Sequence, residues 1–138
     1  MVQPINLHSE AHWLADRVGA QRLSGTYAFR SLLEAGVRLA GSSDAPIEST
    51  DVLAALDAAV HRPTLAADQA ISGLDALRMY TTAASAVRGT EGRLGSLAVG
   101  LQADLVVLSA DPTAVRPAEV HVQRTVIGGI DHFVAQGA

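Results

Sequence analysis

The chain has 138 residues, of which 49% are hydrophobic and 17% charged, so it is long enough for one modest globular domain. A formal net charge of −4 and the complete lack of lysine exclude a general nucleic-acid surface built from basic side chains. No apolar stretch reaches the length of a membrane span, the first residues lack the features of a signal peptide, and no cysteine is present for a disulfide, a thiolate nucleophile or a cysteine zinc site. We therefore expect a cytoplasmic protein without nucleic-acid or membrane partners.

The amino-terminal half is predicted to alternate short strands with helices, which is typical of βα units. A strand end is expected over residues 2–5 and a buried strand over residues 37–40. Polar N-caps, apolar faces and glycine or proline stops predict four helices. The first helix covers residues 10–18, with Ser9 as its cap and Gly19 as its stop, and the second covers residues 27–35 and ends at Gly36. The third runs from Val52 to Val60 and is capped by Ser49 or Thr50. The fourth runs from the Ser72–Asp75 capping box to Tyr80.

The pattern changes after Arg88, where glycines separate short segments. A compact strand is predicted over residues 104–108. A β-hairpin is predicted from residues 122–127 and 130–135 around Gly128 and Gly129. The last fifty or so residues thus form a β-rich segment, and we expect a boundary near Arg88.

Asp44 is the first candidate for chemistry, because it follows the predicted strand at residues 37–40. In α/β proteins the carboxyl ends of strands open into the ligand crevice. Ser49 and Thr50 are expected to cap the next helix, which leaves the Asp44 carboxylate for another role, and Pro46 stiffens its loop. The residues alone leave three alternatives open: catalysis, metal binding, or bracing of the loop.

His8 and His12 are four residues apart and would share one face of a helix, as zinc ligands can, but two partly exposed histidines are the preferred interpretation. His61 is expected to interact with the negative end of its helix, and Asp104 to accept amides of a turn. The remaining polar residues considered are assigned to the exposed surface, namely Arg30, His121 and His132. Neither a serine-hydrolase motif nor a phosphate loop is present in the sequence.

Taken together, the segments resemble the carboxyl-terminal quarter of the amidohydrolase superfamily, specifically its amidohydrolase family 3 branch. The likeness covers nearly the whole chain in order and spacing. The matching stretches are residues 2–4, 13–19, 27–33, 43–46, 76–81, 95–97, 103–108 and 122–125, with Gly129.

The resemblance implies an α/β fold: residues 1–88 would be the last two βα units of a (β/α)8 barrel, with strand seven at residues 2–4 and strand eight at residues 37–40. Residues 89–138 would be the carboxyl-terminal part of a small β-sandwich. It also implies a metal-dependent hydrolase of amide or other non-peptide C–N bonds in small molecules, with zinc as the expected divalent metal. Asp44 matches the family's metal ligand and general base, which orients the attacking water and takes its proton.

The other metal ligands that the family uses are missing, because the sequence contains no H-x-H and no lysine to carboxylate. Asn6 stands where related sequences often carry histidine, and Ser42 where glycine usually precedes Ser-Asp. Since catalytic zinc needs about three protein ligands, we expect the isolated chain to be inactive and to bind metal weakly or not at all. Two barrel units leave an unpaired strand edge, so we expect self-association or pairing with the missing amino-terminal part. The alternative is a non-catalytic binding or assembly module derived from the same region.

Overall fold

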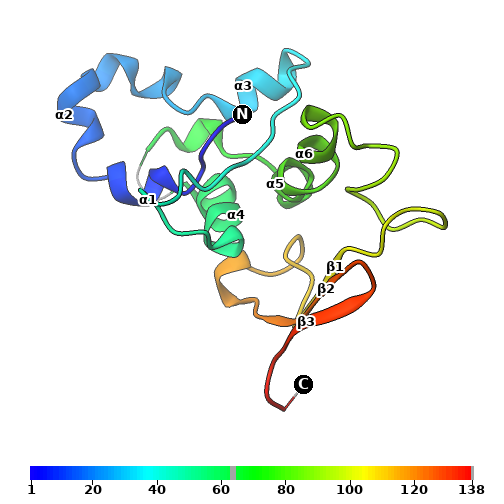
Figure 1. Ribbon diagram of the computed structural model, residues 1–138. Helices are drawn as coiled ribbons and strands as arrows, with labels where there is room; N and C mark the ends of the chain where they lie inside the picture. Colours follow the sequence, from blue (N-terminus) through cyan, green and yellow to red (C-terminus); the bar gives the residue numbers. More distant parts are fainter. Residues whose placement is uncertain (63–64, 138) are drawn as a thin grey trace.

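The computed structural model describes residues 1–62 and 65–137. Over these residues the helices gather around α4, and a three-stranded sheet lies below them (Figure 1). The elements in chain order are α1 (Asn6–Glu10), α2 (Leu14–Val18), η1 (Ala20–Gly25), α3 (Phe29–Glu34), α4 (Val52–His61), η2 (Ala67–Gln69), α5 (Gly73–Tyr80), α6 (Thr82–Val87), β1 (Leu105–Leu108), η3 (Pro117–Glu119), β2 (Val122–Ile127) and β3 (Ile130–Val134). None of the helices in the described part is long and apolar enough to cross a membrane.

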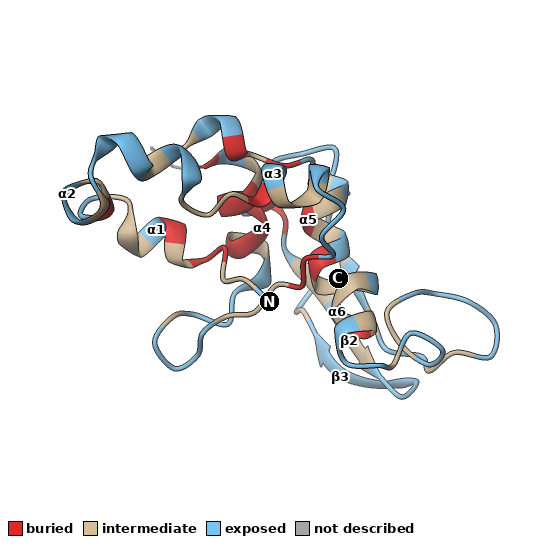
Figure 2. Cartoon of the chain, turned by 90° about the horizontal axis from the view of Figure 1, so that it is seen from above, coloured by how far each residue is buried: buried red, intermediate tan, exposed pale blue. Residues whose placement is uncertain are grey.

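The hydrophobic core forms around α4, where every residue from 55 to 59 is buried (Figure 2). Leu7 of α1, Phe29 of α3 and Met79 of α5 pack in the same cluster, each no more than 1% exposed. Burying a side chain of this size stabilises a fold by roughly 1.5–3 kcal/mol. The core therefore lies among the helices, and the sheet contributes little to it.

The single helix expected over residues 10–18 is wrong, because the chain forms α1 and α2 with a turn between them. Ser9 lies inside α1, so it is not an N-cap; its hydroxyl bonds instead to Glu48, far along the chain. Gly19 ends α2 with a φ of 79°, as expected. The contact with Glu48 is tertiary, which is why local signals misplaced the start of the helix.

The prediction of a buried strand over residues 37–40 is also wrong, because the segment does not form a regular strand. The segment contributes to one isolated parallel bridge, between Val2 and Gly41, in which Val2 N donates to Ala40 O and Ser42 N donates to Val2 O, both at 2.9 Å. Leu39 and Ala40 are buried, whereas Val37 and Arg38 are exposed. Because the described residues pair with this segment at one bridge only, its backbone makes no ladder.

The two helices predicted after Asp44 are confirmed as α4 and α5, but the residue that caps α4 differs from the prediction. Asp51 caps α4 by accepting the amide of Ala54 at 3.1 Å, where Ser49 or Thr50 was expected. The Ser72 hydroxyl caps α5 at the amide of Asp75 as its capping box predicts.

The carboxyl-terminal segment forms one antiparallel sheet in the order β1-β2-β3, which confirms the predicted hairpin. Gly128 and Gly129 form its turn with φ values of 58° and 81°, a conformation that glycine adopts without strain. Asp104 accepts the amide of Gly128 at 2.7 Å, as expected of a turn-bracing carboxylate. This bond and the one from Gln102 lower the pKa of Asp104.

A bidentate ion pair joins the helices to the sheet segment. Arg116 donates to both carboxylate oxygens of Asp57 on α4, at 2.9 and 3.0 Å. The Asp57 side chain is only 3% exposed, and its pKa is lowered, first by the hydrogen bond from Arg116. His61, expected just after the last turn, is instead the last residue of α4 and lies 3.7 Å from the same carboxylate.

Arg62 is a second buried charge and binds only backbone carbonyls among the described residues. Its guanidinium donates to the carbonyls of Thr26 and Tyr27 and to that of Leu65, at 3.0 to 3.2 Å. It also lies 5.3 Å from the ring centre of Phe29. Arg62 thereby holds the turn before α3 against the segment that follows α4.

Candidate functional site

Asp44 lies in the loop that follows the Val2–Gly41 bridge, as the sequence predicts. Its backbone is left-handed with a φ of 60°, a conformation that aspartate tolerates better than most residues. Its carbonyl accepts the amides of Ile47 and Glu48, at 2.9 and 3.4 Å, which closes the loop into a tight turn. The residue is exposed, and within the described part of the chain its carboxylate has no recorded hydrogen bond or ion pair.

The loop is held at its base by Tyr80 of α5. A Cβ atom built on Gly41 would overlap the Tyr80 ring, so the backbone approaches the ring as only glycine allows. The Tyr80 hydroxyl donates to Ser42 O at 3.4 Å, and Gly41 N donates to Met79 O at 2.9 Å. Burial raises the pKa of Tyr80 to about 12, so this phenol is neutral near neutral pH.

The other side of the loop is tied to α1 through Glu48. The Ser9 hydroxyl donates to the Glu48 carboxylate, and its oxygen lies 3.2 Å from the carbonyl of Asn6. Because α1 follows the segment that contains Val2, this contact joins the ends of the two bridged segments. Glu48 was missed in the sequence, because no local pattern links it to a serine 39 positions earlier.

A second polar pair lies next to these residues. The Tyr27 hydroxyl donates to Glu10 at 2.6 Å. Burial, and then the hydrogen bond to the Glu10 carboxylate, raise the pKa of Tyr27, while a bond from Asn6 opposes the rise. The side-chain oxygen of Asn6 is buried and has no hydrogen-bond partner among the described residues. A buried polar atom without a partner costs about 1–3 kcal/mol.

The metal expected from the resemblance does not fit the residues described here. Across residues 1–62 and 65–137 no group of three histidine, cysteine, aspartate or glutamate side chains could hold a metal ion. Asp44 provides one carboxylate, whereas catalytic zinc takes about three protein ligands. The Asp44 loop is therefore at most one part of a metal centre.

The histidines stay outside the site. α1 ends at Glu10, so His8 and His12 do not share one helix, and both are exposed. His132 lies on β3 and His121 just before β2, and both are exposed as predicted. Arg30 is exposed as well, and its side chain donates to the carbonyl of Ala70.

The comparisons with known proteins show the family of the chain. The model of the amidohydrolase family matches residues 1–137, and the chain therefore belongs to the amidohydrolase family. It is 34% identical over 139 residues to the putative amidohydrolase YtcJ of Bacillus subtilis, covering 93% of this chain and 26% of that protein. It is 32% identical to an N-substituted formamide deformylase of Arthrobacter pascens, covering 81% of this chain and 22% of that protein.

Among solved structures, an uncharacterized metal-dependent hydrolase of Pyrococcus horikoshii superposes with a TM-score of 0.77 at 34% identity. The match covers 87% of this chain and 26% of that one. The chain thus has the fold of a piece of a metal-dependent hydrolase, and it spans about a quarter of the length of the relatives it matches.

Proposed function

We propose that this chain is the carboxyl-terminal portion of a metal-dependent hydrolase that acts on amide or other non-peptide C–N bonds. The observation that carries the proposal is Asp44, in a chain of the amidohydrolase family. It is an exposed residue with a left-handed backbone at the end of a bridged segment, and among the described residues its carboxylate has no recorded hydrogen bond or ion pair. Strained, non-glycine left-handed residues gather at functional sites. The C–N specificity is supported by the deformylase relative, whose name specifies an N-substituted formamide.

In this proposal residues 1–88 are the last two units of the barrel and residues 89–138 are part of the sandwich. The parallel contact between Val2 and Gly41 supports neighbouring strands seven and eight. Asp44 would be a ligand of the metal, expected to be zinc, and the general base of the reaction. The other ligands would come from the rest of the enzyme, so the isolated chain would be inactive.

Exposed apolar side chains on one face of the sheet support pairing with that missing portion. The register places Val106, Thr125 and Phe133 side by side, with Ile127 opposite Ile130 two residues further along β2. The apolar members of this row are between 46% and 68% exposed. Apolar side chains gathered on one sheet face mark a surface that another sheet covers in a sandwich.

The test replaces the matching segment of the Arthrobacter pascens deformylase with this chain and assays hydrolysis of an N-substituted formamide. We expect the hybrid to be active and its Asp44→Asn variant to lose activity by a factor of about 100 or more, as for loss of a general base. Asp16→Asn, at an exposed carboxylate on α2, is the matched control and should leave the rate unchanged. The isolated chain is assayed in parallel with zinc or manganese. Robust turnover by the isolated chain that disappears in Asp44→Asn would refute the proposal that it is an incomplete portion.

A further inference from the structure

The turn that carries Asp44 has little support of its own. Two amides, those of Ile47 and Glu48, close it by donating to the Asp44 carbonyl. Residues 44–47 are exposed, so the hydrophobic core does not hold them. Because the Asp44 carboxylate has no recorded hydrogen bond among the described residues, its position follows from that of the turn. The contacts that hold the turn therefore determine the direction of the proposed general base.

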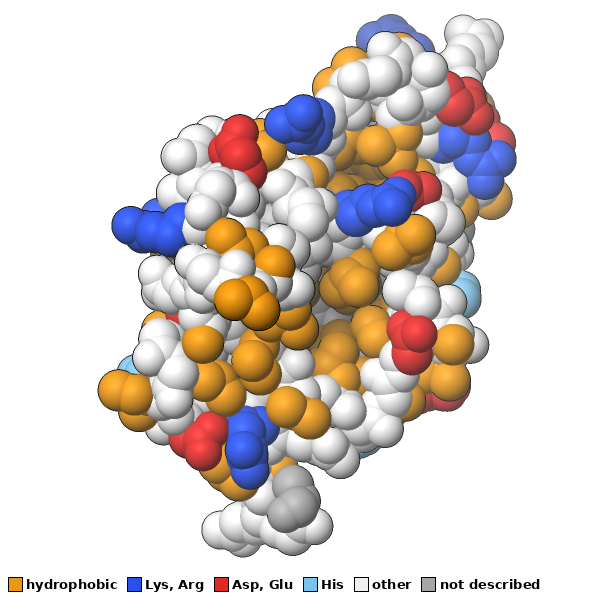
Figure 3. All heavy atoms as spheres, turned by 90° about the vertical axis from the view of Figure 1, so that its right-hand side faces the viewer, with side chains coloured by type: hydrophobic (Ala, Val, Ile, Leu, Met, Phe, Trp, Pro, Cys, Tyr) orange, Lys and Arg blue, Asp and Glu red, His pale blue; other side chains and the backbone are white. Residues whose placement is uncertain are grey.

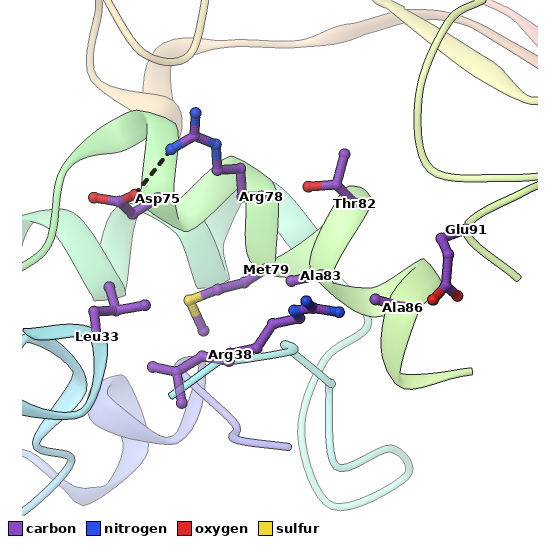
Figure 4. Close-up of a pocket in the computed structure, with 10 residues that line it drawn as sticks. Leu33, Arg38, Asp75, Arg78, Met79, Thr82, Ala83, Ala86 and Glu91 are labelled. Carbon is purple, nitrogen blue, oxygen red and sulfur yellow. Dashed lines mark hydrogen bonds and ion pairs between the residues drawn. The ribbon is translucent and has the colours of Figure 1, made fainter. Parts of the chain in front are cut away.

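The first anchor lies at the base of the loop, on α5. The Tyr80 ring lies against Gly41, and its hydroxyl donates to the carbonyl of Ser42. Beside this anchor an apolar groove of about 530 Å³ follows α5 and α6, visible as a hollow with hydrophobic side chains in Figure 3. Leu39 and Met79 help to line it, and none of the described residues that line it belongs to the turn (Figure 4). The first anchor thus ends at Ser42, and the turn needs another support.

The second anchor is the hydrogen bond from the Ser9 hydroxyl to the Glu48 carboxylate. Within the described part of the chain it is the one recorded hydrogen bond that joins residues 43–48 to another element. Ser9 lies on α1, where Leu7 is fully buried, so the hydroxyl is held in a fixed position. A hydrogen bond to an ionised acceptor is roughly twice as strong as one between neutral groups. A single charge-assisted contact therefore connects the turn to the packed helices.

We infer that Glu48 is a positioning residue for Asp44: the hydrogen bond from Ser9 fixes the turn through Glu48 and thereby directs the Asp44 carboxylate. The inference rests on the proposed function, in which Asp44 is the general base. Glu48 acts through the turn and does not itself touch the reacting atoms. Since the turn lies outside the core, loss of the bond should displace Asp44 with little effect on stability. A displacement of about 1 Å near the chemistry can lower a rate by about 100-fold.

The kinetic experiment uses the hybrid enzyme in which this chain replaces the matching segment of the Arthrobacter pascens deformylase. Glu48→Ala and Ser9→Ala should each lower kcat for an N-substituted formamide by about 10- to 100-fold and change KM by less than about twofold. The two changes together should cost no more than either alone, because both remove the same bond. Glu48→Gln keeps an acceptor oxygen and Ser9→Thr keeps the hydroxyl, so both should stay within about threefold of the parent. Glu34→Ala, at an exposed carboxylate on α3, is the matched control and should leave both constants unchanged.

The isolated chain gives a readout that does not depend on activity. NMR order parameters of the backbone at residues 44–48 should be about 0.85 in the parent and should fall below about 0.6 in Glu48→Ala and in Ser9→Ala. Glu48→Gln and Ser9→Thr should keep the values of the parent. The midpoint of thermal unfolding should fall by no more than about 4 °C in each variant. Order parameters that are low already in the parent, or that do not change when the bond is removed, overturn the inference.

The remaining outcomes separate this inference from the proposed function. Activity that is lost in parallel with the midpoint of unfolding would show that Glu48 supports the fold as a whole, which overturns the inference. An equal loss in Glu48→Gln and Glu48→Ala would assign the effect to the charge and not to the hydrogen bond, and would also overturn it. A parent hybrid without activity contradicts the proposed function, and the order parameters then decide whether the Ser9 bond holds the turn. An active hybrid whose Glu48→Ala variant keeps its kcat contradicts this inference alone.

Discussion

Gly41 offers the sharpest test of how the Asp44 loop is held. In Gly41→Ala the new methyl group overlaps the Tyr80 ring, so either the ring or the loop must move. Overpacking of this kind costs about 1–3 kcal/mol. The φ of Gly41 is not in the left-handed region, so alanine can adopt the same backbone conformation. Alanine also restricts the unfolded chain, which stabilises the protein by about 0.4–1 kcal/mol. The expected net loss is therefore about 1–2 kcal/mol, a sizeable share of a typical stability of about 5–15 kcal/mol.

A double-mutant cycle measured by urea denaturation isolates this contact. Tyr80→Ala removes the ring, so adding Gly41→Ala in that background should cost nothing or stabilise slightly. Tyr80→Phe removes only the hydroxyl and its 3.4 Å bond to Ser42, so the overlap and the full cost should remain. An equal cost of Gly41→Ala in all three backgrounds would show that the Tyr80 ring does not support the loop.

Three further changes test the charges and caps that hold the helices. Asp57→Asn should destabilise the protein at neutral pH. Arg116 lowers the pKa of Asp57 in the folded protein below its ordinary value of 3.8. The ionised carboxylate therefore stabilises the fold fully above about pH 3.8, and this stabilisation is lost as the pH falls through the pKa that Asp57 has in the folded protein. The variant and the parent should thus converge in acid, and a constant difference in urea midpoint across that range would contradict this. Arg62→Met leaves several buried carbonyls without a donor and should cost about 3–5 kcal/mol, with a smaller loss in Arg62→Lys, measured by thermal unfolding. Asp51→Ala removes the cap at Ala54 and should cost about 1 kcal/mol; no loss of helical signal or midpoint would show that another residue caps α4.

Local signals in the sequence placed several elements well. The Ser72 capping box, the glycine stops after α2 and α3 and the paired glycines of the hairpin each act within four residues, so they operate whatever surrounds them. The turn-bracing role of Asp104 was also predicted, although its partner Gly128 is distant in the chain. The resemblance to the family was confirmed by the comparisons. The role assigned to Asp44 remains a prediction.

The errors occurred where a distant partner decides the outcome. Ser9 has the chemistry of an N-cap, but its hydroxyl bonds to Glu48, and α1 begins three residues before it. Residues 37–40 have the apolar pattern of a strand, but among the described residues the segment pairs only through the single bridge between Val2 and Gly41 that follows it. A strand is defined by its neighbours, and most of those expected from the resemblance are not in this chain.

The sequence by itself determined the helix ends, the hairpin and the family, because each depends on residues close together or on their order along the chain. Only the tertiary structure showed that Asp57 binds Arg116 from 59 positions away, that Tyr80 supports the loop of Asp44, and that an apolar groove lies open beside Leu39. These contacts depend on how helices pack against one another, which periodicity and capping signals do not encode. They also show why Asp44 is held in position although the structure brings no further metal ligand to it within the described residues.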